Sequence, residues 1–299
     1  MVTTDIHGPT SHVYFSQRLR LHYVDWGNRA APPLLMVHGG RDHCRNWDWV
    51  AQELRHDYHI IAPDLRGHGD SEWLRGSVYR TQDYVYDIAQ LIHQLDLAPV
   101  TILSHSLGGQ ISLAYTGIYP ENVAKILAIE GLGMSPKRNA EREAQPPYER
   151  MRNWIGELRG IAGRMPRRYA TLDEAFQRMH DANKHLSAEH ARHLTEHGVN
   201  QNEDGTYSWK FDNYVHADRP FGMSPDQNAA LWQRIACPAM LVYGEDSWAS
   251  DPVKDGRAKH FKTAEIVRVP DASHWVHHDQ LDIFMGHVKR FLSADYRTP

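Results

Sequence analysis

The sequence is poor in cysteine, in long apolar runs and in net charge, and each shortage argues against a class of protein. Only two cysteines, Cys44 and Cys237, occur in 299 residues, so no disulfide framework is implied and a reducing compartment is the simpler expectation. No apolar run approaches the roughly 20 residues that span a bilayer. The net charge of −4 favours neither nucleic acid nor an anionic membrane as a partner.

The N-terminal stretch "MVTTDIHGPTSH" has no basic patch followed by an apolar segment, so we expect no signal peptide. We therefore expect a cytoplasmic protein. Its composition, 41% hydrophobic and 23% charged, is ordinary for a globular chain that buries a sizeable core. The 21 histidines are by their number alone no evidence for a metal.

Short apolar segments alternate with longer amphipathic ones along the chain. Near-continuous apolar strands are typical of a parallel sheet that helices cover on both faces. The stretch 12–27 reads as an antiparallel hairpin at the sheet edge. We therefore predict an α/β fold with a mostly parallel, doubly wound sheet. The predicted core strands are 33–39, 58–64, 100–106, 124–131, 239–246 and 264–270, and the predicted helices 80–97, 107–120 and 277–292.

The segment 135–232 interrupts this alternation. It contains no convincing core strand and is rich in Arg, Glu and His. Residues 202–212 read as a small hairpin around Asp204 and Gly205. A structureless loop of this length is uncommon, so we predict a mainly helical cap at 135–232, inserted into a core that comprises 1–134 and 233–299.

The stretch "LSHSLGG" (103–109) lies where a predicted strand turns into a helix. A sharp turn of this kind exposes one residue and tolerates only small residues two before it and two or three after it. Around Ser106 these positions hold Ser104, Gly108 and Gly109. Around Ser104 they would include an isoleucine and a leucine, which would crowd the turn. Ser106 is therefore the predicted nucleophile of a G-x-S-x-G elbow that has serine in place of the first glycine.

A serine hydroxyl needs a base to take its proton and an acid to hold that base. Asp246 and His274 each lie just past the C-terminal end of a predicted strand. Because the carboxyl ends of parallel strands meet at one edge of a sheet, these side chains can converge on Ser106. We predict a triad of Ser106, His274 and Asp246.

Both partners of Ser106 have competitors. Glu130 follows the strand before the cap, so it is an alternative acid, a residue that lines the site, or a structural residue. His277 and His278 are predicted in the first turn of the last helix. Since a catalytic histidine is expected on the preceding loop, His274 is the preferred base.

Two further groups of residues are candidates for a metal site and for the wall of a substrate pocket. "HLTEH" (193–197) places two histidines at helical spacing, as in zinc sites. No third ligand is evident, so we interpret it as a solvated helix face and predict no metal. Trp73, Trp248 and Trp275 adjoin loops at the predicted catalytic edge; they are candidates for the wall of a substrate pocket, with fold packing as an equal alternative.

These motifs resemble an α/β-hydrolase with an inserted cap, of the esterase, epoxide-hydrolase and haloalkane-dehalogenase type. The resemblance covers nearly the whole chain. It implies that the backbone N–H groups of Gly40 and Leu107 form an oxyanion hole. Related epoxide hydrolases and dehalogenases carry aspartate at the elbow, so Ser106 favours acyl transfer. The supporting strings are "HGG" (38–40), "DLRGHGDS" (64–71), "SHSLGG" (104–109), "YGEDS" (243–247) and "ASHWVHHDQ" (272–280).

The sequence therefore predicts a cofactor-independent serine hydrolase that cleaves a small or medium carboxylic ester or lactone, bound between core and cap. One alternative is hydrolysis of a carbon–carbon bond in a ketone-type substrate by the same triad. A second, from a different class, is a ligand receptor that retains vestigial hydrolysis. The acyl group, the leaving group and the oligomeric state are left open.

Overall fold

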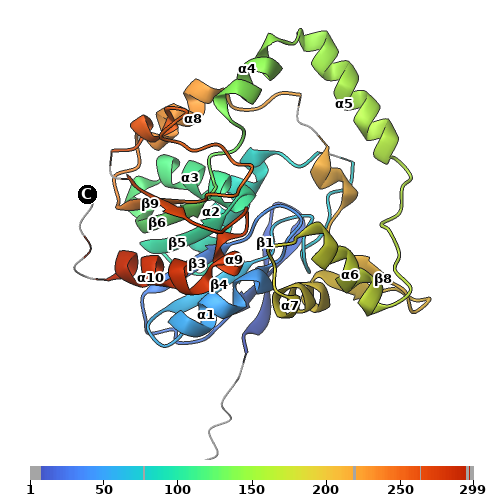
Figure 1. Cartoon of the computed structure of the whole chain (residues 1–299), viewed down its shortest axis with the longest axis horizontal. Helices are drawn as coiled ribbons and strands as arrows, with labels where there is room; N and C mark the ends of the chain where they lie inside the picture. Colours follow the sequence, from blue (N-terminus) through green and yellow to red (C-terminus); the bar gives the residue numbers. More distant parts are fainter. Residues whose placement is uncertain (1–7, 77, 218–219, 263, 294–295, 297–299) are drawn as a thin grey trace, which may run out of the picture.

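The computed structural model, which describes residues 8–76, 78–217, 220–262, 264–293 and 296, contains an eight-stranded sheet that runs through the molecule (Figure 1). Its spatial order is β1-β2-β4-β3-β5-β6-β9-β10. The strands are β1 (Thr10–Ser16), β2 (Leu19–Asp25), β3 (Pro33–Val37), β4 (His59–Pro63), β5 (Val100–His105), β6 (Val123–Ile129), β9 (Ala239–Gly244) and β10 (Ala264–Val269).

All six predicted core strands are present and pair in parallel, and β1 and β2 form the predicted antiparallel hairpin at one edge. Every residue of β5 and of β9 is buried. This double-sided burial explains their continuous apolar sequences. The predicted mostly parallel α/β fold is confirmed.

Helices cover both faces of the sheet. One hydrophobic cluster joins the sheet to α2, α3 and α8, and a second joins the opposite face to α1, α9 and α10 (Figure 1). The core helices are α1 (Asp48–Leu54), α2 (Thr81–Gln94), α3 (Leu107–Ile118), α9 (Val276–Asp279) and α10 (Leu281–Leu292), with short 3₁₀ turns η1 (Cys44–Trp47), η2 (Pro120–Asn122) and η4 (Arg257–His260).

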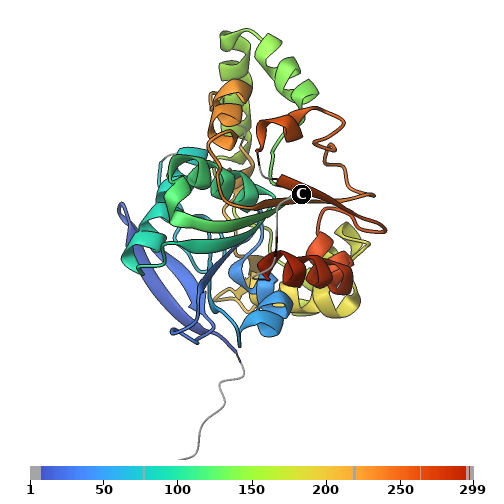
Figure 2. The same cartoon turned by 90° about the vertical axis from the view of Figure 1, so that its left-hand side faces the viewer.

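The segment between β6 and β9 is mainly helical and divides into separate parts. The pair α4–α5 has no buried residue and rises away from the sheet, whereas α6 and α7 lie on another side of the molecule, with α7 against η1 (Figures 1 and 2). The elements are α4 (Pro136–Ala144), α5 (Pro147–Ile161), α6 (Leu172–Ala182), α7 (Ala188–Gly198), β7 (Val199–Gln201), β8 (Tyr207–Trp209), η3 (Asn213–His216) and α8 (Pro225–Trp232).

The predicted hairpin around Asp204 and Gly205 is present as the antiparallel pair β7–β8. The division into core and cap stays a prediction. The last helix of the segment predicted as the cap is α8, and it packs against the core. Helix α8 packs on α3, where a Cβ on Gly117 would lie 2.5 Å from the Leu231 carbonyl oxygen. Trp232 belongs to the cluster that covers the sheet.

The structure bears on two expectations from the sequence, one about membrane-spanning segments and one about the cysteines. In the described residues, no helix combines the length and the apolar character needed to cross a bilayer; the cytoplasmic location stays a prediction. Cys44 and Cys237 are buried free thiols.

Candidate active site

The site lies at the carboxyl ends of the central strands. The strand order changes direction at β3, which lies between β4 and β5, and such a switch point opens a crevice outside the sheet. The loop after β3 carries Gly40, and the turn after β5 carries Ser106.

Ser106 occupies the predicted sharp turn. Its backbone has φ 52° and ψ −113°, a conformation that residues other than glycine seldom adopt. A Cβ on Gly108 would lie 2.4 Å from the Val37 carbonyl oxygen, and one on Gly109 would lie 2.5 Å from the Gly131 Cα. The close approach of strand and helix therefore demands the small residues that follow Ser106.

Ser104 is fully buried and donates its hydroxyl hydrogen to the Leu127 carbonyl at 3.1 Å. It therefore links β5 to the neighbouring strand β6 and does not face the site.

His274 lies between Ser106 and a carboxylate. Its Nε2 is 3.0 Å from the Ser106 Oγ, and its Nδ1 makes a short hydrogen bond with the Glu130 Oε2. When Nδ1–H donates to Glu130, Nε2 is left to accept the hydroxyl hydrogen of Ser106. The loop between β10 and α9 carries His274, as expected, and Glu130 directly follows β6.

The placement predicted for Asp246 is wrong. Asp246 is exposed in the turn after β9, where its backbone N–H donates to the Ala272 carbonyl at 3.0 Å. Strands β6 and β9 are neighbours and parallel, so both carboxylates start near the same edge. Glu130 is only 5% exposed and turns toward His274, whereas Asp246 lies one residue further from its strand and faces solvent. Glu130, the alternative acid, holds the place beside His274.

The loop after β9 also holds the Glu130 carboxylate. The Gly244 N–H donates to Oε1 at 3.1 Å, and the Ser247 hydroxyl donates to Oε2 at 2.7 Å. These two hydrogen bonds hold the carboxylate in position behind His274. Ser247 was part of the string "YGEDS", but nothing in the sequence marked it as a partner of Glu130.

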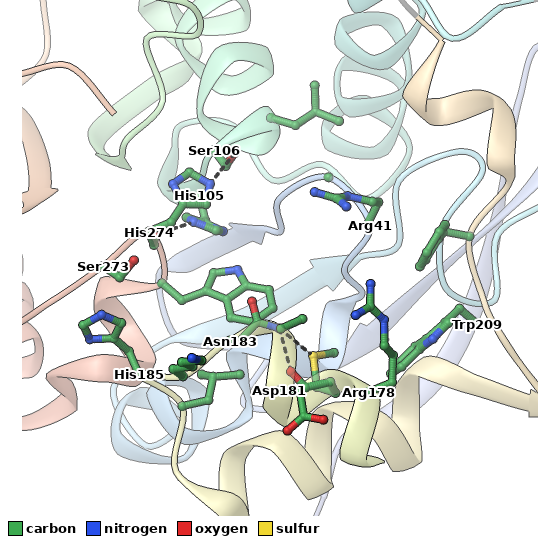
Figure 3. A pocket seen from close by; sticks show the side chains of 18 of the residues that line it. Arg41, His105, Ser106, Arg178, Asp181, Asn183, His185, Trp209, Ser273 and His274 are labelled. Carbon is green, nitrogen blue, oxygen red and sulfur yellow. Dashed lines mark hydrogen bonds between the residues drawn. The ribbon is translucent and has the colours of Figure 1, made fainter. Parts of the chain in front are cut away.

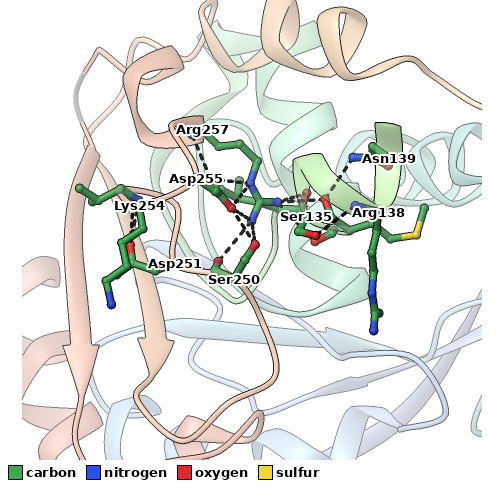
Figure 4. A network of polar contacts seen from close by, with 12 residues as sticks. Ser135, Arg138, Asn139, Ser250, Asp251, Lys254, Asp255 and Arg257 are labelled. Carbon is green, nitrogen blue, oxygen red and sulfur yellow. Dashed lines mark hydrogen bonds and ion pairs between the residues drawn. The ribbon is translucent and has the colours of Figure 1, made fainter. Parts of the chain in front are cut away.

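A buried arginine joins the loop after β6 to the loop after β9 (Figure 4). Arg257 is 7% exposed, pairs with Asp255 at 2.7 Å and donates to the carbonyls of residues 132–134 at 3.1–3.3 Å. Because these two loops carry Glu130 and Ser247, the network stabilises their spacing behind His274.

His105 supports His274 from the other side, a role that the sequence did not reveal. Its Nε2–H donates to the His274 carbonyl at 2.9 Å (Figure 3). Burial holds the pKa of His105 well below its usual range, so this ring stays neutral and keeps that tautomer. The rings of His105 and Trp248 each lie 4.7 Å from the His274 ring, measured between centroids.

Gly40 and Leu107 lie side by side above Ser106. A Cβ on Gly40 would lie 3.8 Å from the Leu107 Cδ2. Leu107 opens α3, so its N–H has no acceptor within the helix. Both residues line the cavity that also contains Ser106 and His274. The oxyanion role of their N–H groups stays a prediction.

A buried histidine orders the loop that carries Gly40. His38 is fully buried, accepts a hydrogen bond from the Leu65 N–H at 3.0 Å and donates Nδ1–H to the Gly39 carbonyl at 2.6 Å. Burial lowers the pKa of His38 to about 3. The ring therefore stays neutral, with one nitrogen as donor and the other as acceptor.

A cavity of about 1030 Å³ opens over Ser106. Its wall includes residues of α6, the chain that follows α6, and Trp209 of β8 (Figure 3). Trp248 and Trp275 line it, whereas Trp73 is not among its lining residues. The described cap elements therefore form one side of the cavity, and the loops around Ser106 and His274 form the other.

The motif "HLTEH" lies on α7, where the His193 and His197 rings are 4.5 Å apart between centroids. The structure adds a neighbour that the sequence did not show: the His193 Nε2 lies 3.1 Å from the Asp48 Oδ2. Arg45 pairs with the same carboxylate at 2.6 Å, so a cation would have to compete with that guanidinium. The absence of a metal stays a prediction.

A serine held in a strand–turn–helix over a mostly parallel sheet, with a histidine beside it, defines a hydrolase of the α/β class. The chain belongs to the alpha/beta hydrolase fold family, whose sequence profile matches residues 32–281. The predicted resemblance is thereby confirmed, and the protein is a hydrolase.

Individual relatives are hydrolases of several kinds. A 3-hydroxybutyrate-oligomer hydrolase from Cupriavidus necator is 29% identical over 278 residues, which cover 85% of this chain and 87% of that protein. A serine hydrolase-like protein from Danio rerio is 25% identical over 225 residues, 74% of this chain and 67% of that protein. The crystal structure of E-2-(acetamidomethylene)succinate hydrolase is similar with a TM-score of 0.79 at 21% identity, covering 96% of this chain and 100% of that chain.

Proposed function

We propose that this protein hydrolyses a small or medium carboxylic ester or lactone through Ser106, His274 and Glu130. The observation that carries the proposal is the continuous hydrogen-bonded path from the Ser106 hydroxyl through His274 to a buried carboxylate. This arrangement activates a hydroxyl that is otherwise a weak nucleophile.

In the first half of the reaction, the Ser106 Oγ bonds to the acyl carbon while its proton passes to the His274 Nε2. His274 then gives this proton to the leaving oxygen as the ester bond breaks, which releases the alcohol and leaves an acyl-enzyme. Glu130 holds the neutral imidazole as the Nδ1–H tautomer and stabilises the imidazolium that forms when Nε2 takes the proton.

In the second half, water gives a proton to His274 and attacks the acyl carbon. The proton returns to the Ser106 Oγ as the acyl–serine bond breaks and the carboxylic acid leaves. In both halves, the N–H groups of Gly40 and Leu107 donate hydrogen bonds to the carbonyl oxygen as negative charge develops on it. One such donor typically contributes about 2.7–4 kcal/mol to lowering the barrier.

Two features support an ester over other bonds. A serine at the elbow forms an acyl-enzyme, whereas alkyl displacement needs a carboxylate nucleophile. Hydroxy acids form oligomers through ester bonds, so the name of the Cupriavidus necator relative agrees with this choice. Carbon–carbon bond hydrolysis would use the same residues, and a vinylogous diketone in the substrate screen distinguishes it.

The test is the intact mass of the protein after brief exposure to a fluorophosphonate. The native chain is expected to gain one adduct, Ser106→Ala none, and Ser104→Ala the same adduct as the native chain, because Ser104 is buried between strands. A folded native chain that gains no adduct, or an adduct that persists in Ser106→Ala, would overturn the proposal; the first result would favour the receptor alternative.

A further inference from the structure

The lining of the cavity above Ser106 carries an excess of positive charge. Its basic side chains are Arg41, Arg167, Arg178 and Lys184, and its acidic ones are Asp181 and Asp279. The chain as a whole has a net charge of −4, so this excess is local and does not follow from composition.

Among the described residues, three of these cations have no hydrogen-bond, ion-pair or ring partner: Lys184 and the two arginines Arg41 and Arg178. The fourth, Arg167, lies over the Tyr169 ring at 5.0 Å. Figure 3 shows the side chains of Arg41 and Arg178 extending into the cavity, Arg41 from the loop after β3 and Arg178 from α6. One comes from each wall of the site.

The acidic residues of the lining have other partners. Asp279 accepts a hydrogen bond from the Ser273 N–H at 2.8 Å, and Asp181 accepts one from the Gln177 side chain at 2.9 Å. Neither carboxylate pairs with Arg41 or Arg178, so these two guanidinium groups are available to an anion that enters the cavity.

Arg41 is also held at a defined place. It directly follows Gly40, which we propose to bind the oxyanion, and has φ 62°, in the left-handed region that few residues other than glycine adopt. Outliers of this kind gather at functional sites. An acyl carbonyl held by Gly40 therefore lies within a short chain length of the Arg41 side chain.

We infer that the substrate of this site carries a carboxylate several bonds away from the scissile ester, and that Arg41 and Arg178 bind it. A guanidinium presents a planar fork that matches a carboxylate with two parallel hydrogen bonds. The inference rests on the proposed function and adds the substrate class, a monoester of a dicarboxylic acid or an ester of similar charge.

The test compares mono-4-nitrophenyl adipate with its methyl ester, which has the same acyl chain but no charge. Release of nitrophenolate is measured for both, and the rate with Ser106→Ala is subtracted. The kcat/KM of the anionic ester is expected to exceed that of the neutral one by about tenfold or more, chiefly through KM. Added salt is expected to reduce this ratio.

Arg41→Gln and Arg178→Gln should each lower the ratio of the two kcat/KM values at least fivefold, and Arg178→Lys should retain part of it. Arg159→Gln is the matched control, since Arg159 is an exposed arginine of α5 outside the cavity, and it should keep the native ratio. Equal values for the two esters, or a ratio that the arginine variants leave unchanged, would overturn the inference.

The same experiment separates this inference from the proposed function. Hydrolysis of both esters at equal rates, lost in Ser106→Ala, supports the proposed function and rejects the carboxylate. Binding is measured independently by the tryptophan fluorescence of Ser106→Ala during titration with monomethyl adipate, compared with dimethyl adipate. If the protein binds monomethyl adipate but hydrolyses neither nitrophenyl ester, the proposed function is rejected and the anion site is retained. If it binds the two adipates equally well, the inference is rejected.

Discussion

At the scale of single residues, the choice of the acid is the main result. Glu130 and Asp246 follow neighbouring parallel strands, and either could reach His274 in principle. The structure buries Glu130 beside His274 and leaves Asp246 in solvent.

Replacement of the two carboxylates by their amides tests this assignment. Glu130→Gln should lower kcat for ester hydrolysis by roughly 10²–10⁴-fold, because the amide stabilises the wrong imidazole tautomer and does not stabilise the cation. Asp246→Asn should change kcat less than about twofold, since substitutions at exposed positions are usually mild. The assignment fails if the two variants exchange these effects in steady-state assays with a nitrophenyl ester.

At the scale of elements, the contact between α3 and the strands β3 and β5 determines the site. The helix begins directly at Leu107, so its first turn lies against the backbone of the strands. This closeness exposes Ser106 and places Leu107 beside Gly40.

Gly108→Ala should destabilise the protein by at least about 1–3 kcal/mol, the usual cost of overpacking. The added Cβ would lie 2.4 Å from the carbonyl oxygens of both Val37 and His38, and backbone atoms of a central strand have little room to move.

The matched control is Gly156→Ala on α5, where nothing lies within 4 Å of the new Cβ. That change should stabilise the chain slightly, by about 0.5–1 kcal/mol, because alanine favours a helix. Urea unfolding midpoints measure both variants; equal shifts for the two would contradict the packing argument.

At the scale of the whole molecule, a line of histidines crosses from the site to α7. The rings of His105 and His277 are 5.0 Å apart, those of His277 and His278 4.3 Å, and those of His278 and His190 5.1 Å, measured between centroids. Burial lowers the pKa of each of these four histidines. Neutral rings therefore fill the junction between the core and α7.

Stability should fall on acidification below about pH 6.5, the ordinary pKa of histidine. In this range the histidines bind protons in the unfolded chain, whereas the buried rings of the folded protein stay neutral. The free energy of unfolding therefore decreases as pH decreases. Each of the fully buried rings of His105, His277 and His278 lowers the free energy of unfolding by up to about 1.4 kcal/mol per pH unit of acidification, until its own folded pKa is reached.

Urea unfolding at several pH values between 7 and 5 measures the slope. His278→Leu should reduce it, because both nitrogens of His278 are buried without a hydrogen-bond partner among the described residues and His190, His193 and His43 further disfavour its protonation. His56→Gln is the control at an exposed position. A slope that His278→Leu leaves unchanged would contradict this account.

The sequence by itself determined the strands, the elbow and the histidine. The central strands could be predicted from their continuous runs of apolar residues, because burial on both faces of the sheet requires such runs. Ser106 could be distinguished from Ser104 because the steric demands of the turn act on residues within one short stretch. His274 could be preferred to His277 and His278 because of its place before the last helix.

Only the tertiary structure decided which groups meet across distant segments. Whether Glu130 or Asp246 reaches His274 depends on where two adjacent strands end and on which way one side chain turns. The support from His105, the neighbourhood of Asp48 and His193, and the entry of Arg41 and Arg178 into one cavity all join residues far apart in the chain. Local pattern encodes local sterics, whereas these contacts of a few ångströms arise from the packing of cap elements and strands against one another.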